Sequence, residues 1–274
     1  MTLTRKQLFI LLALLSGILF FASDERPTPA PVSHTIAQTN IASTIPQTPQ
    51  GKYDYLEITS SCDPYFDGLC IHAYAGPGTE YEKRSELRNG MIFKIKSRET
   101  VNGQVWYHVY FDEWLRYPER VEGDWYIPAV AGRVVTDDGE KLLGRSKSVT
   151  SKRIVVDLSE HMIHAYDGNK HFMTTKVSTG ISLTPTPQGT FTVYKKTPSR
   201  YMQGPLPGVS DIPFDLPGVP WNLYFTQDGA VIHGSYWHDR YGTEQSNGCI
   251  NLPPEVSKIL YDWADLGTTV TIQD

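Results

Sequence analysis

The sequence has few cysteines and no excess of positive charge. Only three of its 274 residues are cysteine, and 25 lysines and arginines stand against 30 aspartates and glutamates, a formal net charge of −5. This balance excludes a basic surface for nucleic acid. What remains is an ordinary globular composition, 40% hydrophobic, with 16 tyrosines and 6 tryptophans. Large aromatic rings pack well on pleated surfaces, so the composition favours β-structure.

Long apolar runs are also scarce, and the longest, residues 8–22, follows Arg5 and Lys6. It is shorter than the roughly 20 residues of a membrane span and is typical of a signal-peptide core. Bulky Phe20 disfavours cleavage after Ala22, so a removed signal peptide and a retained anchor both stay open for residues 1–23. Either alternative predicts an exported, extracytoplasmic protein that touches the membrane only through this segment.

Export changes how the cysteines are interpreted, because disulfides persist outside the cytoplasm. Cys62 and Cys70 stand eight residues apart, and either they close a small loop or they stay free. Cys249 is then left over. A leftover cysteine in an exported protein indicates intermolecular pairing or a reactive thiol.

Composition divides the rest of the chain into four segments. We expect a flexible Pro/Thr-rich linker, a β-rich domain, a polar connector with one helical turn, and a second β-rich domain. These segments are residues 24–52, 53–135, 136–151 and 152–274. The dipeptides Asn102-Gly103 and Asp167-Gly168 each lie between β-rich runs and predict hairpin turns.

One helix is expected in a chain that is otherwise mostly β. The stretch "PPEVSKILYDWADLG", residues 253–267, has prolines in its first turn and a glycine after its end. Its predicted apolar face is Val256, Ile259, Leu260 and Trp263. The short apolar run "GAVIHG" upstream predicts a strand that ends near His233.

A nucleophile and a base lie close together near the C-terminus. Peptide-bond chemistry by cysteine needs a thiolate, a base to form it and donors for the oxyanion. His233 would end a rigid strand, Cys249 follows 16 residues later, and Gly248 lets a substrate carbonyl approach the backbone. The N–H groups of Gly248 and Cys249 are candidate oxyanion donors. From spacing alone, a buried structural cysteine remains the stronger alternative.

A family resemblance changes that balance. The runs "STGISLTPTPQGTFTVYKK", "IHG" and "SNGCINL" occur in the order typical of the L,D-transpeptidase (YkuD-type) catalytic domain of bacterial cell-wall enzymes. The family pattern places a histidine before Ser/Thr-His-Gly-Cys, an apolar residue, and Asn or Arg. The matching positions are His233, Ser246, Gly248, Cys249, Ile250 and Asn251, with Gly234 following the histidine.

The resemblance implies a fold and a reaction. Residues 152–274 would form a β-sandwich with one main helix, in which His233 deprotonates Cys249. The thiolate would attack the L,D peptide bond of a peptidoglycan stem tetrapeptide and release D-Ala. An amine of a second stem, or water, would then resolve the thioester, with no metal or organic cofactor. Asn247 replaces the family's second histidine, and since it cannot carry a proton, we expect it to affect substrate contact or rate.

A second resemblance covers residues 53–135. The segment "YAGPGTEYEKRSELRNG", residues 74–90, is similar to bacterial SH3-type domains, which implies a small β-barrel. Residues 112–123, "DEWLRYPERVEG", form an insertion relative to the compact form. A wall-binding module and a rigid spacer remain equal interpretations.

Other candidate residues carry weaker signals. His161 and His164 are three apart and would face opposite sides of a strand, which disfavours a shared metal. His238 and Asp239 could orient His233, but we expect this pair to be solvated. The segment 200–225, rich in Pro, Gly and aromatics, is either an irregular surface loop or a lid over the peptide groove. Its candidate substrate contacts are Tyr201, Trp221 and Tyr224.

Two other functions compete with an L,D-transpeptidase. A papain-like peptidoglycan endopeptidase would place its cysteine before its histidine and at a helix N-terminus, the reverse of the order here. A non-catalytic wall-binding protein would tolerate loss of the Cys249 thiol.

Overall fold

The computed structural model describes residues 51–274, except 122 and 145–149. The expected signal peptide or anchor at 1–23, and nearly all of the expected linker, lie outside these residues. Within the described part of the chain, no helix is long and apolar enough to cross a membrane. The described residues are mostly strand, with one α-helix, as the sequence predicts.

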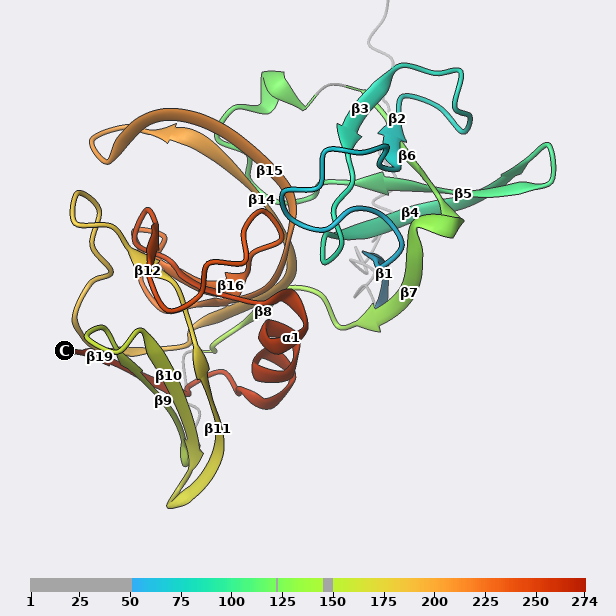
Figure 1. Ribbon diagram of the computed structural model, residues 1–274. Helices are drawn as coiled ribbons and strands as arrows, with labels where there is room; N and C mark the ends of the chain where they lie inside the picture. The colour runs from blue at the N-terminus through green and yellow to red at the C-terminus, as the bar shows by residue number, and fades with distance from the viewer. Residues whose placement is uncertain (1–50, 122, 145–149) are drawn as a thin grey trace, which may run out of the picture. The chain divides into compact units, whose positions relative to one another are not determined.

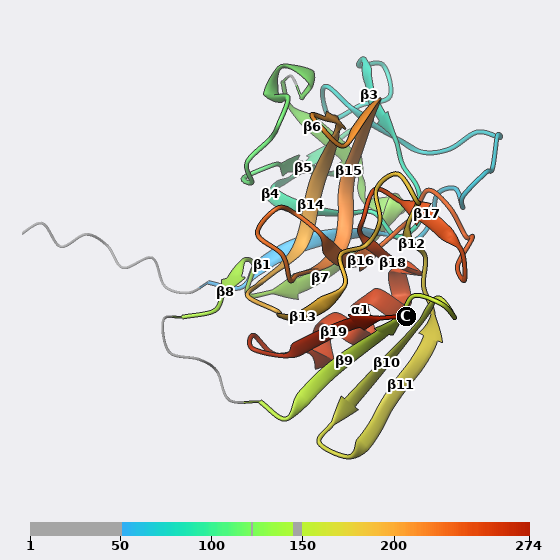
Figure 2. The ribbon, with the colours of Figure 1, turned by 90° about the vertical axis from the view of Figure 1, so that its left-hand side faces the viewer.

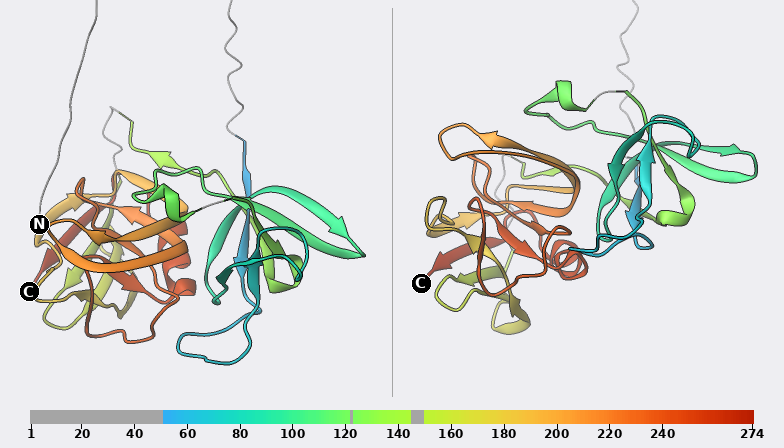
Figure 3. Two further views of the ribbon diagram at one scale, coloured as in Figure 1. Left: turned by 90° about the horizontal axis from the view of Figure 1, so that it is seen from above. Right: turned by 45° about the horizontal axis from the view of Figure 1, so that its top comes forward.

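The first β-rich segment forms one seven-stranded sheet. In spatial order its strands are β3 (Lys83–Glu86), β2 (His72–Tyr74), β6 (Trp125–Pro128), β5 (Gln104–Tyr110), β4 (Ile92–Val101), β1 (Tyr53–Ile58) and β7 (Gly132–Asp137). The β4–β5 hairpin turns at Asn102-Gly103, which confirms that prediction, and it extends beyond the rest of the sheet (Figure 3). Two short 3₁₀ helices, Pro118–Arg120 and Ala129–Ala131, flank β6.

A disulfide joins Cys62 and Cys70 and closes the loop between β1 and β2. Cys249 is therefore the free cysteine of the chain. The observed strand order is that of one seven-stranded sheet with β3 and β7 at its ends. This order does not identify an SH3-like barrel, so the SH3-like identity of the segment stays a prediction.

The C-terminal segment contains two five-stranded sheets and a two-stranded one (Figures 1 and 2). The first is ordered β11 (Lys170–Lys176), β10 (Met162–Asp167), β9 (Lys152–Asp157), β19 (Thr269–Gln273) and β13 (Gly189–Thr192). The second is ordered β18 (Ile250–Leu252), β16 (Val231–Gly234), β15 (Ser210–Tyr224), β14 (Lys195–Leu206) and β8 (Lys141–Leu142). The short pair is β12 (Thr179–Gly180) with β17 (Glu244–Ser246).

The main hydrophobic core brings both five-stranded sheets together with α1 (Pro254–Trp263). Ile154 and Val270 from the first sheet pack in one cluster with Leu223 and Ile250 from the second. Tyr55, from the first β-rich segment, belongs to the same cluster. The predicted boundaries at 135 and 152 therefore do not separate two independent cores, and they stay predictions of chain organisation.

Two segments differ from the sequence expectations. Residues 195–224 are not an irregular loop, because β14 and β15 pair along nearly their whole length, with register shifts near Tyr201 and Pro205. Their pairing, drawn in orange in Figure 1, satisfies the backbone despite the many prolines and glycines. In the described part of the connector, residues 136–144 and 150–151, the short strand β8 adds to the edge of β14 and no helical turn forms.

The helix forms where predicted, and three of the four predicted apolar residues contact the core: Leu260 is buried, and Val256 and Trp263 pack against it. Ser257, Leu260 and Tyr261 are its buried residues, whereas Ile259 is 53% exposed. Small Ser257 faces the core because Gly234 of β16 packs closely there: a Cβ on Gly234 would lie 2.6 Å from the Ser257 Oγ. Close strand–helix approach, which the apolar pattern does not encode, sets the rotation of the helix.

Lys196 holds the C-terminal end of this helix. Its buried ammonium donates to the carbonyls of Tyr261, at 2.6 Å, and Ala264, at 2.5 Å. Burial lowers the pKa of Lys196 to about 8. We expect Lys196→Met to lower the free energy of unfolding by about 2–4 kcal/mol, because both carbonyls lose their donor.

Urea unfolding followed by circular dichroism would measure this loss. Lys195→Met is the matched control, because Lys195 pairs with Glu140 near the surface and should contribute less than about 1 kcal/mol. Equal effects of the two substitutions would contradict the role assigned to Lys196.

Candidate active site

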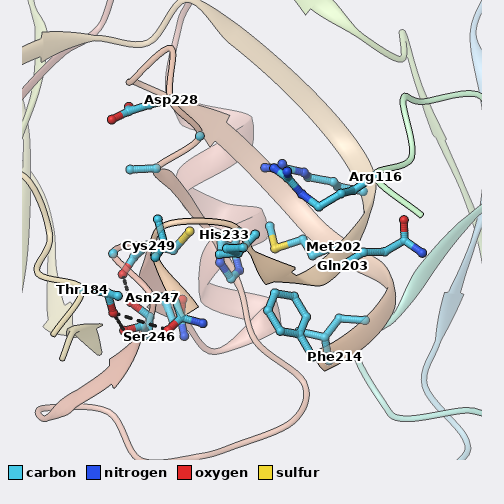
Figure 4. Close-up of a pocket in the computed structure, with 18 of the residues that line it drawn as sticks. Arg116, Thr184, Met202, Gln203, Phe214, Asp228, His233, Ser246, Asn247 and Cys249 are labelled. Atoms are coloured by element: carbon cyan, nitrogen blue, oxygen red, sulfur yellow. Dashed lines mark hydrogen bonds between the residues drawn. The ribbon is translucent and has the colours of Figure 1, made fainter. Parts of the chain in front are cut away.

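Parallel pairing of two short strands places the candidate base, His233, beside the candidate nucleophile, Cys249. In the β16–β18 ladder, Ile232 pairs with Ile250 and His233 with Asn251. Cys249 immediately precedes β18, so it enters the site one position before this ladder begins. Figure 4 shows the Cys249 sulfur and the His233 ring next to each other on the wall of one pocket. Two residues 16 positions apart thus meet because a polar loop returns the chain parallel to β16.

The turn at 246–249 presents the thiol. The Ser246 hydroxyl donates to the Cys249 carbonyl at 2.5 Å, which closes the turn. Gly248 has φ +100°, in the left-handed region that glycine adopts without strain. Asn247, at the position of the family's second histidine, is exposed at the pocket rim, and Thr184 contacts it with an Oγ1–Oδ1 distance of 3.4 Å.

His233 is held in one orientation by the backbone. Its ring is 1% exposed, and Nδ1 lies 3.0 Å from the Gly234 carbonyl. A carbonyl only accepts, so Nδ1 carries the proton and Nε2 is left free to accept one. Burial lowers the pKa of His233 to about 4; the Gly234 hydrogen bond opposes this, and the charges of Arg200 and His238 add to it.

Cys249 is partly exposed to the pocket, yet its thiol is largely desolvated. Burial raises the pKa of the Cys249 thiol, against the opposing effects of the Val231 backbone and the Arg200 charge. A lowered histidine pKa and a raised cysteine pKa both favour the uncharged forms. The pair therefore rests as neutral imidazole and thiol.

This resting state predicts a specific pH dependence. We expect the rate of Cys249 alkylation by iodoacetamide to keep rising with pH above the usual thiol range, because only the thiolate reacts. A preformed thiolate–imidazolium pair would instead give a plateau from acidic pH. Rates from pH 5 to 10, read by intact mass, separate the two cases. The Cys249→Ala protein is the control, since the other two cysteines are disulfide-bonded.

The pair opens into a cavity of about 750 Å³. Its walls come from the 183–187 loop, the β14–β15 hairpin, the 228–230 turn and the 245–251 segment. A further part comes from the first β-rich segment, through Trp114 and Arg116. The cavity is large enough for a short peptide segment beside the thiol.

His238 differs from the expectation that the His238–Asp239 pair is solvated. It is 4% exposed, and its Nε2 accepts from the Asn251 amide at 3.0 Å, whereas Asp239 is exposed. Burial and the Arg240 charge lower the pKa of His238 to about 4. His238 contacts Asn251 and does not orient His233. The Gly234 carbonyl orients the His233 ring.

The three aromatic candidates for substrate contact lie in different environments. Tyr201 lines the cavity but is 6% exposed, packed against Phe111 and Trp125. Trp221 and Tyr224 are buried and do not line the cavity. The hairpin turns these two inward because β15 enters the core over its second half, so the structure does not bring them to the substrate side.

The sequence interpretation missed Trp114 and Arg116 as cavity residues. Both belong to the insertion at 112–123, which was recognised only as a departure from the compact domain form. The insertion was the sequence signal that could have identified these two residues as part of the cavity. Among the described residues, no group of three or more His, Cys, Asp or Glu side chains is placed to hold a metal ion.

Comparisons with known proteins bear on the C-terminal segment. Residues 151–272 match the family model of the YkuD domain, the L,D-transpeptidase catalytic domain. No curated protein matches the chain. The NMR structure of the catalytic domain from E. faecium L,D-transpeptidase is 31% identical over 47% of this chain and 99% of that chain, with a TM-score of 0.39.

Two mycobacterial structures cover more of the chain at lower identity. The L,D-transpeptidase from Mycobacterium smegmatis is 18% identical over 66% of this chain and 98% of that chain, with a TM-score of 0.43. L,D-transpeptidase 3 from Mycobacterium tuberculosis gives the same four values. With TM-scores below 0.5, these likenesses add nothing to the family match. The chain therefore contains a YkuD-family L,D-transpeptidase catalytic domain, which makes the protein an enzyme of the L,D-transpeptidase class.

Proposed function

We propose that the protein cross-links peptidoglycan stem peptides, with Cys249 as nucleophile and His233 as general base and acid. The observation that carries the proposal is the Cys249–His233 pair at the head of the β16–β18 ladder, open to a peptide-sized cavity within the YkuD domain. The donor is a stem tetrapeptide, and the bond attacked joins its third residue to D-Ala.

In the first step, Nε2 of His233 takes the thiol proton as the sulfur attacks the scissile carbonyl. A carbon–sulfur bond forms, the carbon–nitrogen bond to D-Ala breaks, and His233 returns the proton to the leaving amine. The N–H groups of Gly248 and Cys249 are the proposed oxyanion donors, because both residues line the cavity and the backbone turns sharply at Gly248.

In the second step, the amine of an acceptor stem attacks the thioester and His233 removes its proton. The peptide cross-link forms and the thiol is regenerated. Water in place of the amine gives hydrolysis, so the same site can trim the donor. Ser246 holds the turn before Cys249, Gly234 allows the close contact with α1, and Asn251 pairs in the β16–β18 ladder. Asn247 acts at the rim of the donor site.

The rival functions fit the site less well. Cys249 lies in a turn between β17 and β18 and not at a helix N-terminus, which disfavours a papain-like endopeptidase. A non-catalytic wall-binding protein has no need of a buried imidazole beside a free thiol. We assign the protein to the extracytoplasmic cell envelope, with residues 1–23 as signal or anchor and the first β-rich domain as an SH3-like module.

Product analysis tests the proposal. Full-length protein would be incubated with purified tetrapeptide muropeptides, and the products read by mass spectrometry. A covalent dimer lacking one D-Ala supports transpeptidation, and monomer shortened by D-Ala supports hydrolysis at the same site. Unchanged substrate, with a protein whose thiol is alkylated normally, would contradict the proposed donor.

A further inference from the structure

Two arginines from separate parts of the chain line the catalytic cavity. Arg200 lies on β14 of the catalytic domain, and Arg116 lies in the arm, which we define as residues 112–121 of the first β-rich segment. Figure 4 shows Arg116 reaching over the cavity near Met202, with its guanidinium toward the side of Cys249 and His233. The positive charge of Arg200 acts on both catalytic groups.

No carboxylate of the described residues forms a salt bridge with either guanidinium group. Among residues 51–121, 123–144 and 150–274, neither Arg116 nor Arg200 forms a salt bridge or a side-chain hydrogen bond; they only approach the rings of Trp114 and Tyr224. Neighbouring Arg120, in contrast, bonds the Gly204 carbonyl and pairs with Asp215.

The acids around the cavity do not neutralise this pair. Asp228 lines the cavity, but it lies apart from Arg116, with its carboxylate directed away (Figure 4). Glu113 interacts electrostatically with Arg200 and accepts the Tyr201 N–H at 2.6 Å, but burial raises the pKa of Glu113, which disfavours its negative form. The cavity therefore keeps an excess of positive charge next to the nucleophile.

The arm is fixed in place by the β14–β15 hairpin. The Gln203 side chain accepts from the Tyr117 N–H at 2.9 Å and donates to the Tyr117 carbonyl at 3.0 Å. The Tyr117 hydroxyl donates to the Pro205 carbonyl at 2.9 Å. With Glu113 bonded to Tyr201 on the other side, the stretch from Trp114 to Arg116 is anchored at both ends. The backbone that carries Arg116 is therefore ordered before an anion binds, and only the exposed Arg116 side chain must lose freedom on binding.

We propose that Arg116 and Arg200 form a carboxylate subsite that binds the free C-terminal carboxylate of the donor stem peptide. The inference rests on the proposed function and names how its substrate is selected. The D-Ala carboxylate lies one residue beyond the attacked carbonyl, within reach of groups that line the cavity around Cys249. Arginine suits this task because its planar donors match a carboxylate in two-point contacts. The first β-rich domain thereby contributes a specificity residue to the active site.

Paired ligands test the subsite without turnover. Full-length Cys249→Ala protein would be titrated by calorimetry with a stem tetrapeptide and with its C-terminal carboxamide. We expect the carboxylate form to bind about 10- to 100-fold more tightly, the range for charge-assisted hydrogen bonds. Adding Arg116→Gln should reduce this ratio to about 3-fold or less, mainly by weakening the carboxylate form, and Arg200→Gln should act in the same direction.

Two controls keep the test independent of the proposed function. Arg98→Gln removes an exposed arginine of the same domain that does not line the cavity, and it should leave the ratio unchanged. Iodoacetamide labelling of Cys249 in the Arg116→Gln and Arg200→Gln proteins should stay measurable, which shows an intact site. Equal binding of both ligands to the Cys249→Ala protein overturns the subsite, even where the unmodified enzyme processes the tetrapeptide. Failure of the unmodified enzyme to process it would instead refute the proposed function.

Discussion

Replacement of Cys249 by alanine is expected to lower the turnover of stem tetrapeptide by about 10⁴- to 10⁶-fold, the loss typical of removing a nucleophile. No other free thiol exists in the chain to replace it. Cys249 is partly exposed as a residue and follows a turn closed by the Ser246 hydroxyl, so the substitution should leave the fold intact.

Intact-mass spectrometry under turnover gives the direct measurement. The unmodified enzyme should gain the mass of the acyl donor minus D-Ala, and the alanine protein should gain nothing. Ser246→Ala is the informative comparison: it removes the bond to the Cys249 carbonyl but keeps the thiol, so it should slow acylation without abolishing it. A Cys249→Ala protein that still forms cross-linked dimer would refute the assignment of the nucleophile.

Replacement of His233 by glutamine is expected to lower kcat/KM by about 10²- to 10⁴-fold, the contribution usual for a general base. Glutamine fills much of the same volume and retains hydrogen-bonding groups, but it cannot accept the thiol proton. Because burial lowers the pKa of His233 to about 4, the imidazole is neutral and able to accept a proton at neutral pH. In the unmodified enzyme, activity should fall only as the pH drops through about 4, instead of near the usual 6.5.

The His233 prediction has its own control and its own alternative. His171→Gln changes an exposed histidine that does not line the cavity and should keep kcat/KM within about 2-fold. His238→Gln separates the two buried histidines of the region: His238 contacts Asn251, so its loss should cost less than the loss of His233. A His233→Gln enzyme with normal kcat/KM, beside an inactive His238→Gln enzyme, would transfer the role of base to His238.

Local signals in the chain were sufficient for much of the fold. The Asn102-Gly103 turn forms with positive φ at both residues, as type I′ chemistry requires. The turn at Asp167-Gly168 also forms, between β10 and β11, and the chain reverses a first time at 158–161, between β9 and β10. Prolines in the first turn and a glycine after the last placed α1 correctly.

Long-range packing decided what local signals could not. The β14–β15 hairpin carries prolines and glycines that, read locally, indicate irregular chain, yet pairing across the hairpin and against β16 makes it regular. Trp221 and Tyr224 are buried by that pairing, which no residue pattern within 201–224 reveals. The rotation of α1 depends on Gly234, 20 or more residues before the helix.

The sequence by itself determined which residue types stand at the site and in what order. Spacing alone left a structural cysteine as the stronger alternative to a nucleophile, and the family resemblance of the runs around His233 and Cys249 changed that balance. The tertiary structure alone decided the protonation state of the pair and the walls around it. Desolvation by neighbours remote in sequence sets both pKa values, and hydrogen bonds between Tyr117 and Gln203 bring Arg116 to a site more than a hundred residues away.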